Sequence, residues 1–569
     1  MGRKSSTKKI VRELTKEKHP KAQSRKINFR LKIQKHQIYG AILVIIMISI
    51  LISAGYLIFQ RAFRSTEIAR FLPEKQTVFT VELNYNPEHS QFSKTAKILE
   101  KYPYYSAQAL KDFLTQKLQT NFETQINPWL GKNLGLSILN SKNTPGETFT
   151  VYFLETKDKA QAEKWLRQSA SAQPYNNREI FLLQNGARLT LIDEYLFLSE
   201  KDQSLKELID FSNSDEDALF DSSRYLRAKN NLPFNYIAFA FINFKNINDD
   251  SLTAFESIKP FLKFFDSEGL ALVAMDEKFA LQSFLNLSGE EIENMDFLEN
   301  QEKYQADLAA YVKEDALIFW GGNNLENQLR RLILAMSGGD KDSMQIFDTV
   351  LQNYTNRYFG PEITLSLDIL PLFKNEFALA IEEYDKKLTY KLLLKINNSE
   401  KALEELHDIF DNFAKVGSVY EKKIVTFTMA DGTVGKEIMA VPENIRRQKL
   451  QIDDYDIFEL TIGQKNSNIF YAVIDRYAIV TDNFDTMKNA VNMIKNGGKS
   501  LRLSKDFQEL ITHILSSSDE VSYLNFDKLM PLIFKGGKVP KYLLPLSSLT
   551  SGKNYFQDGV TTINYLDIN

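Results

Sequence analysis

Hydrophobic positions divide the chain into one uninterrupted apolar stretch near the amino terminus and a long body in which apolar residues recur periodically. The stretch from Gln37 to Gln60 has 24 consecutive residues without a formal charge, half of them Ile, Leu or Val. A helix rises about 1.5 Å per residue, so roughly 20 apolar residues cross a bilayer core of about 30 Å. The pattern predicts a transmembrane helix over 37–60, with the lipid bilayer as its partner.

Charge around this segment predicts its orientation. Residues 1–36 contain 13 Lys or Arg and two acidic residues, and the more basic flank stays in the cytoplasm. The apolar run is longer than the roughly 7–15 residues of a cleaved signal peptide. We therefore expect an uncleaved signal anchor in the cell membrane, with a basic cytoplasmic tail (1–36), a short helical neck (61–71) and an extracytoplasmic body.

The body alternates strand and helix patterns. Between 72 and 288, strands are expected near 78–83, 134–138, 149–154, 236–244, 270–275 and 279–287, with a hairpin near 189–198. Apolar residues at three- and four-residue steps predict helices between them, as in the helix that begins at Lys401. Such alternation predicts an α+β unit with a mixed or antiparallel sheet and helices covering one face.

The same unit occurs twice. Ile192-Asp193-Glu194-Tyr195 recurs 282 positions later as Ile474-Asp475-Arg476-Tyr477, and Phe241–Phe244 matches Tyr523–Phe526 at the same offset. Earlier in the unit the offset is about 240, as between Leu72 and Val312. The sequence thus predicts a tandem duplication, with a first repeat at 72–288, a charged, helical connector at 289–310 and a second repeat at 311–569. The change of offset predicts an insertion of about 40 residues near 416–454, forming a hairpin or a lobe.

Charge and cysteine content narrow the function classes. Outside the tail, 57 basic and 71 acidic residues remain, so the body is acidic while the tail is basic. Nucleic acid is therefore not an expected partner of the body, since phosphate binding needs a basic surface. The chain has no cysteine, which removes disulfides, thiol nucleophiles and zinc–thiolate sites.

Two motifs resemble chemical sites. Gly497-Gly498-Lys499-Ser500 lacks the first glycine of a phosphate-binding loop and follows a helix, so a helix-ending turn is the better interpretation. Asp193 and Asp475 could form a paired-carboxylate site, but each lies between two apolar runs. Asp at such a position favours a two-residue hairpin turn.

Other chemistry-bearing residues are dispersed. The body's histidines, His89, His407 and His513, have no metal-ligand spacing. The acidic clusters Asp215–Asp217 and Asp453–Asp456 lack the spacing of a calcium loop. The three tryptophans, Trp129, Trp165 and Trp320, are candidates for lining an apolar pocket, although such residues are more often core.

Several segments resemble one bacterial family. LPEKQTVFTVELNYNP after a single anchor, Trp-Leu-Gly before a strand, ILPLFKNEFALAI from Ile369 and SYLNFDKL from Ser522 are similar to a family of single-pass membrane proteins of unknown function. The resemblance covers most of residues 65–569, although the second repeat has Val312-Lys313 in place of Leu-Pro. It implies bacterial origin and an envelope location, and it assigns no activity and no site residues.

No residue is therefore assigned as catalytic, cofactor-binding or metal-binding, no cofactor is expected, and the ligand and oligomeric state stay open. The leading hypothesis is a non-enzymatic envelope interaction or scaffold module that binds an envelope protein or the cell wall. The alternatives are a binding protein for an apolar or cell-wall ligand and an uncharacterised hydrolase.

Overall fold

The computed structural model describes residues 68–101, 108–247, 265–287, 304–330, 341–417, 420–429, 432–442, 446–462, 467–505, 507–508, 511, 518–534, 538–541, 543–556 and 559–568. The predicted tail, the transmembrane segment 37–60 and residues 61–67 of the neck lie outside these ranges. Within them, no helix combines the length and apolar character that a membrane span requires.

The part of the chain before residue 288, here the first half, has ten described strands. They are β1 (Thr77–Asn84), β2 (Leu130–Asn140), β3 (Thr148–Thr156), β4 (Ser171–Tyr175), β5 (Arg178–Leu182), β6 (Arg188–Ile192), β7 (Tyr195–Ser199), β8 (Ala238–Asn243), β9 (Phe265–Ala274) and β10 (Lys278–Leu287). Its described α-helices are α3 (Ser90–Glu100), α4 (Gln108–Leu118), α5 (Lys159–Ser169), α6 (Asp202–Ser212) and α7 (Ser223–Asn230).

The second half, from residue 304 onward, has twelve described strands. They are β11 (Ile318–Asn323), β12 (Glu376–Tyr384), β13 (Lys387–Lys395), β14 (Tyr420–Thr428), β15 (Val434–Pro442), β16 (Arg446–Ile452), β17 (Tyr455–Ile462), β18 (Ser467–Ile474), β19 (Tyr477–Thr481), β20 (Glu520–Asn525), β21 (Leu546–Tyr555) and β22 (Gly559–Ile568). Its described α-helices are α10 (Lys341–Phe359), α11 (Ser399–Gly417), α12 (Phe484–Asn496) and α14 (Phe526–Ile533).

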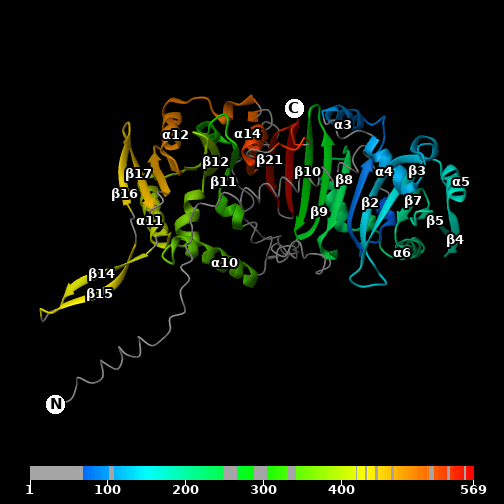
Figure 1. Ribbon diagram of the computed structural model, residues 1–569, viewed down its shortest axis with the longest axis horizontal. Helices are drawn as coiled ribbons and strands as arrows, with labels where there is room; N and C mark the ends of the chain where they lie inside the picture. The colour runs from blue at the N-terminus through cyan, green and yellow to red at the C-terminus, as the bar shows by residue number, and fades with distance from the viewer. Residues whose placement is uncertain are drawn as a thin grey trace, which may run out of the picture. The chain divides into compact units, whose positions relative to one another are not determined.

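Twenty of these strands form one sheet, and all their described pairings are antiparallel (Figure 1). The pairings give the order β4-β5-β6-β7-β3-β2-β1-β8-β9-β10 in the first half. They continue as β22-β21-β20-β11-β12-β13-β19-β18-β17-β16 in the second half. The expected α+β class is confirmed, and the sheet is antiparallel rather than mixed.

Counted outward from the junction, the two halves use their strands in the same order. β10 takes the place of β22, β1 of β11, and β4 of β16. Even isolated bridges correspond, since Pro73 pairs with Ala218 as Lys313 pairs with Ser500. The positions of these bridges are separated by the offsets of 240 and 282 that the sequence contains.

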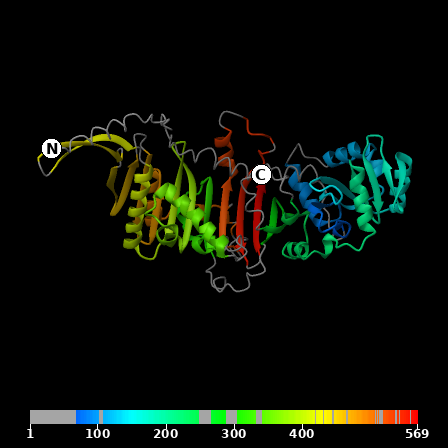
Figure 2. The same ribbon diagram turned by 90° about the horizontal axis from the view of Figure 1, so that it is seen from below.

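The junction is the antiparallel pairing of β10 with β22, from Lys278↔Asp567 to Asn286↔Gly559. At its middle, Leu281 pairs with Asn564 and Gln282 pairs with Ile563. Ile563 and Asn564 follow Leu281 and Gln282 by the offset of 282, so each of the two pairs is the counterpart of the other. The same relation holds between the two sides of an isologous dimer interface. In Figure 2 the red strands of the carboxyl-terminal end lie in the middle of the sheet.

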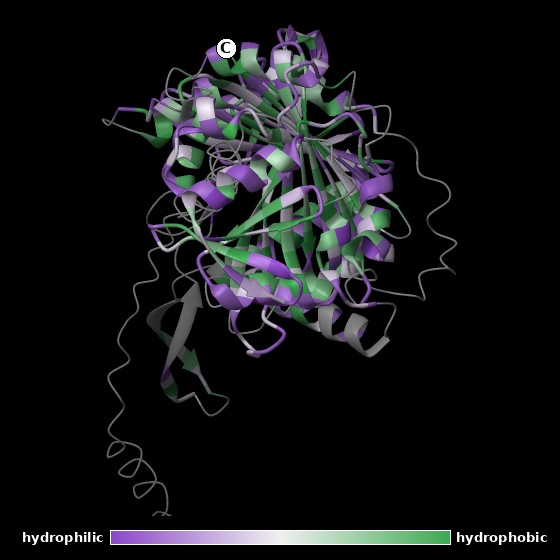
Figure 3. Cartoon of the chain, turned by 90° about the vertical axis from the view of Figure 1, so that its right-hand side faces the viewer, coloured by the Kyte–Doolittle hydropathy of each residue, from purple (hydrophilic) through white to green (hydrophobic). Residues whose placement is uncertain are grey.

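Helices cover both faces of the sheet, which corrects the expectation of a single covered face. Neighbouring residues on a strand point to opposite faces. Leu393 packs in the core that contains Met487 of α12, and Leu394 packs in the core that contains Leu406 of α11. Figure 3 shows apolar strands in the interior and polar residues on the helices outside.

Three predicted segments can be compared with the structure in part. The end of the neck is a 3-10 turn, Ile68–Phe71, rather than an α-helix. The end of the connector is likewise a 3-10 turn, Asp307–Tyr311, and residues 288–303 lie outside the description. Tyr304 and Leu308 are buried in the core of the second half. Within the predicted insertion, β14 and β15 form a hairpin that is a separate two-stranded sheet.

The two outermost strands carry residues that oppose pairing with another chain. β4 contains Pro174, which has no N–H to donate. β16 begins with Arg446-Arg447-Gln448-Lys449, and all four residues are exposed. Charge and proline on edge strands are common protection against edge-to-edge aggregation.

Removing two of these charges is expected to open the β16 edge. The double variant Arg446→Val, Lys449→Val leaves Arg447 and its ion pair with Asp411 in place, and we expect association that increases with concentration. Light scattering of the purified full chain in detergent measures it. The matched control Arg446→Lys, Lys449→Arg should keep the wild-type mass, and an unchanged mass for the valine variant would refute the edge argument.

Candidate functional site

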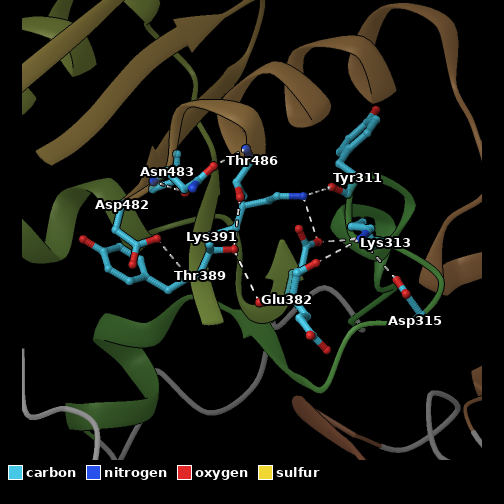
Figure 4. A network of polar contacts seen from close by, with 12 residues as sticks. Tyr311, Lys313, Asp315, Glu382, Thr389, Lys391, Asp482, Asn483 and Thr486 are labelled. Carbon is cyan, nitrogen blue, oxygen red and sulfur yellow. Dashed lines mark hydrogen bonds and ion pairs between the residues drawn. The ribbon is translucent and has the colours of Figure 1, made fainter. Parts of the chain in front are cut away.

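The closest described pair of fully buried opposite charges lies in the second half (Figure 4). Lys391 Nζ lies 2.9 Å from Glu382 Oε1, and the two side chains are 0% and 1% exposed. Buried ion pairs of this kind are candidate catalytic groups, because burial perturbs the pKa values of their members.

The β12–β13 hairpin positions both residues. Asp385 and Lys386 adopt positive φ in its two-residue turn, which sets the register in which Glu382 lies opposite Thr389 and Ala380 lies opposite Lys391. Glu382 and Lys391 thus occupy neighbouring positions on the same face, within reach of each other.

The pair attaches a loop and a helix to the sheet. Lys391 Nζ donates to the carbonyl oxygen of Tyr311 at 3.0 Å, and Glu382 Oε1 accepts from the backbone N–H of Lys313 at 2.9 Å. On the neighbouring strand position, Thr389 Oγ1 accepts from Thr486 Oγ1 of α12 at 3.0 Å. Figure 4 shows these groups converging from the 311–315 loop, the hairpin and α12.

The electrostatic environment of Lys391 resembles that of an activated lysine, but Lys391 is not accessible to solvent. Burial lowers the pKa of Lys391, and the adjacent Glu382 carboxylate opposes that shift. A lysine with a lowered pKa beside a carboxylate can act as a nucleophile or base. The two side chains are 0% and 1% exposed, and their hydrogen bonds hold Tyr311 and Lys313 against the sheet.

The first half has its own buried charged group, at a different place in the fold. Glu82 Oε1 accepts from the Tyr236 hydroxyl at 2.8 Å and lies 3.9 Å from Lys229 Nζ. Lys229 Nζ also donates to the Tyr225 hydroxyl at 3.2 Å. All four residues are buried.

Sequence reasoning missed both ion pairs. The available signal was a charge at a position that the strand alternation assigns to the interior, as at Glu82 within VFTVELN. Its partner, however, lies on another element and is identified only by the fold.

Glu376 at the start of β12 is a third buried charge. Burial raises its pKa to about 7, and Asp307 adds to the rise, while the N–H of Leu308, which donates to Oε1 at 2.8 Å, opposes it. This carboxyl group therefore titrates near neutrality in the folded protein.

The two motifs singled out in the sequence are turns. Asp193 and Asp475 have φ of 51° and 52° in two-residue turns between paired strands, and they lie in different halves. Gly497 ends α12, with its N–H donating to Met493 O, and Ser500 forms the bridge with Lys313.

The histidines and acidic clusters have ordinary partners. His89 caps α3, and His407 Nδ1 lies 2.8 Å from the Tyr471 hydroxyl, with burial lowering its pKa; His513 lies outside the described residues. Asp453 and Glu216 pair with Lys495 and Lys142. Within the described residues, no three His, Asp or Glu side chains are grouped to hold a metal ion.

The tryptophans do not converge on one pocket. Trp129 and Trp165 pack against each other at 5.5 Å between ring centroids in the first half, and Trp320 packs on Phe377 in the second half. A separate apolar cavity lies between α4 and the sheet, lined by residues such as Phe113 and Tyr152, with a volume of about 30 Å³. Ligand pockets are about 300–1,000 Å³, so this cavity is too small for an apolar ligand.

Breaking the Lys391–Glu382 pair is expected to destabilise the second half. Lys391→Met leaves Glu382 buried without a counter-charge, a cost of about 3–5 kcal/mol. Guanidinium denaturation of the full chain in detergent, in a Trp129→Phe, Trp165→Phe background, follows Trp320 as the reporter of this half.

Two further variants make this test specific. Lys395→Met on the same strand removes a half-exposed pair with Asp307 and should cost no more than about 1 kcal/mol. The double variant Lys391→Met, Glu382→Leu should recover most of the loss. Equal losses in the free energy of unfolding for Lys391→Met and Lys395→Met would contradict the role of the buried pair in attaching Tyr311–Lys313 to the sheet.

Glu376→Gln is expected to change stability in a pH-dependent way. The pKa of about 7 in the folded protein lies above the ordinary glutamate value of 4.5. The folded state therefore binds the proton more tightly, and stability falls as pH rises between these values. The variant should therefore be more stable than wild type by about 1–3 kcal/mol at pH 8.5, with little difference near pH 4.

The same guanidinium titrations at the two pH values provide the measurement. Glu437→Gln, at an exposed position, is the control that should show no such pH dependence. A Glu376→Gln difference that is the same at both pH values would rule out the titration of this carboxyl group as its cause.

Comparisons with known proteins place the chain in a family without an assigned activity. No curated protein matches it. Among solved structures, crystal form IV of TP0453 is 11% identical with a TM-score of 0.22, covering 45% of this chain and 79% of that one. Crystal form I of TP0453 is 9% identical with a TM-score of 0.21, covering 38% and 77%. Both scores are too low to carry an argument about fold or function. The family model described as "Protein of unknown function (DUF3352)" matches residues 38–537, and the chain therefore belongs to that family.

Proposed function

We propose that this chain is a non-enzymatic, single-pass membrane protein whose tandemly duplicated body serves as an extracytoplasmic interaction module of the cell envelope. The uncharged segment 37–60 and the basic residues before it support the location. The equal strand order of the two halves and the constant sequence offsets support the duplication.

The non-enzymatic part of the proposal is supported by the contrast between buried charged groups and exposed apolar side chains. The described charged groups with the strongest burial, Lys391 and Glu382, are closed off from solvent. The same half also has exposed apolar side chains, among them Val350, Tyr354 and Tyr358 on α10, and Ile424, Phe427, Met429 and Val434 on the β14–β15 hairpin. Exposed apolar clusters mark interaction surfaces.

The duplication gives such a module a rigid base. The β10–β22 pairing makes the two halves one continuous sheet, so a partner docked on either half is held through backbone hydrogen bonds rather than through a linker. Among the described residues, the β14–β15 hairpin occurs in the second half and has no counterpart in the first, which makes the two halves inequivalent as binding surfaces.

Single-cysteine labelling tests the location and topology. Because the chain has no cysteine, Ser5→Cys and Glu400→Cys each introduce a single thiol on opposite sides of the segment. A membrane-impermeant maleimide applied to intact cells should label Glu400→Cys and leave Ser5→Cys unlabelled until the cells are lysed.

A charged variant of the segment is the control. Val44→Arg, Ile48→Arg adds roughly 2.5–3.5 kcal/mol per charge at the centre of a membrane helix, and the chain should then be extracted from membranes by carbonate. Labelling of Ser5→Cys in intact cells, or carbonate release of the wild-type chain, would overturn the proposal.

A further inference from the structure

The β14–β15 hairpin is the described part of the chain that most clearly lacks cover. Its strands pair with each other, from Tyr420↔Pro442 to Thr428↔Val434, and with no other described strand. A two-stranded hairpin in water is marginally stable at best. Figure 1 shows it in yellow, drawn apart from the strands of the main sheet.

Its outer part exposes four apolar side chains, here called the hairpin tip. Ile424 and Val434 are 66% exposed, Met429 is 50% exposed and Phe427 is 42% exposed. Apolar exposure of this density on a soluble surface marks an interaction site or an aggregation liability.

The strand register distributes the tip over both faces of the hairpin. Val434 lies opposite Thr428, and paired residues point to the same face. Thr428 is four residues from Ile424, so Val434 shares a face with Ile424. Phe427 and Met429 alternate with these positions and lie on the other face, where the Phe427 ring lies over Gly435. A partner with one docking surface would cover one face and leave the other in water. A medium that surrounds the tip would cover both.

A second exposed apolar group adjoins the base of the hairpin. Val350, Tyr354 and Tyr358 recur at four-residue steps along α10, and all three are exposed. The end of α10 packs on the end of α11 through Phe359 and Phe413, with 5.6 Å between ring centroids, and the hairpin begins three residues after α11 ends. Tyrosine is the residue type that favours the headgroup level of a bilayer.

We propose that the hairpin tip inserts into the interface of the bilayer in which the chain is anchored, which makes the hairpin a second membrane contact of the body. The inference rests on the proposed function, because the anchor at 37–60 holds the body beside that bilayer. Lys436 is exposed on the hairpin and Arg446 is exposed four residues after its end, and long basic side chains of this kind can reach the lipid headgroups.

The depth of insertion is limited by the hairpin's own polar groups. Both outer edges of a two-stranded sheet carry backbone N–H and C=O groups without strand partners, and such groups do not enter the hydrocarbon core. The charged side chains of Lys436 and Glu437 are exposed close to the tip. The tip therefore lies at the headgroup–acyl boundary, within about 5–10 Å of the surface.

Site-specific fluorescence on the full chain in liposomes tests the proposal. A polarity-sensitive dye is attached to Phe427→Cys or Val434→Cys, one from each face, in vesicles of phosphatidylglycerol and phosphatidylethanolamine with or without lipids spin-labelled near the headgroup. Leu367→Cys, at a position that is 72% exposed outside the hairpin, is the matched control.

We expect both tip positions to show blue-shifted emission and lipid quenching at least about threefold stronger than at the control, as interfacial insertion requires. Flotation of the same liposomes reports the anchor independently. Chain that floats without quenching at the tip would overturn the inference and leave the proposed function standing, whereas chain that does not float would refute the anchor itself.

Two variants sharpen the outcome. Ile424→Ser, Phe427→Ser, placed one on each face, should reduce quenching at Val434→Cys to the control level. Disulfide formation between Val434→Cys chains, together with quenching no stronger than at the control, would overturn the inference in favour of a second copy of this chain as the occupant.

Discussion

The antiparallel pairing of β10 with β22 is the interaction on which the rest of this fold depends. Each strand is the last of its half, and their register unites the two halves in one sheet. A half whose last strand stayed unpaired would expose a row of backbone donors and acceptors, which is a template for aggregation. Pairing the two last strands removes both of these edges at once. Among the described strands of this sheet, β4 and β16 are then the outermost, and they are protected by Pro174 and by basic residues.

The buried ion pairs follow from the same architecture. Residues of a sheet that is covered by helices on both faces are shielded from water, and a single unpaired charge buried there would cost several kcal/mol. Lys391 and Glu382 neutralise each other and bind the backbone of Tyr311 and Lys313, so their charges fix a loop that has no strand partner of its own along most of its length. Lys391 resembles a reactive lysine, but in this conformation it attaches the loop to the sheet. Its hydrogen-bond partners, Glu382 and the carbonyl oxygen of Tyr311, also keep solvent away from it.

The halves differ most where the hairpin is added. The two halves use their strands in the same order, so an element that the described residues show in one half only is a good candidate for a specific function. The hairpin is such an element, and it combines exposed apolar residues with a connection to α11 and α10. In the proposed arrangement its instability in water is offset by the environment it enters.

The sequence alone indicated the α+β class, most strands of the first half and the two aspartate turns, and it predicted the repeat. Alternation located strands such as β1 and β10 to within a few residues, since side-chain period is a local property of the backbone. Asp193 and Asp475 were identified as turn residues because positive φ selects for such residues locally. The sequence offsets of 240 and 282 predict two repeats, and the isolated bridges Pro73↔Ala218 and Lys313↔Ser500 are separated by the same offsets.

Only the tertiary structure decided which elements meet. The junction through β10 and β22, the helices on both faces, and the partners of Glu382 and Glu82 join residues that are far apart in the chain. No local pattern encodes such pairings, because they depend on how the whole sheet is ordered. The exposure of Ile424 and Phe427 was likewise decided by the tertiary structure. An alternating strand predicts one covered face, but these two exposed side chains lie on opposite faces of the hairpin.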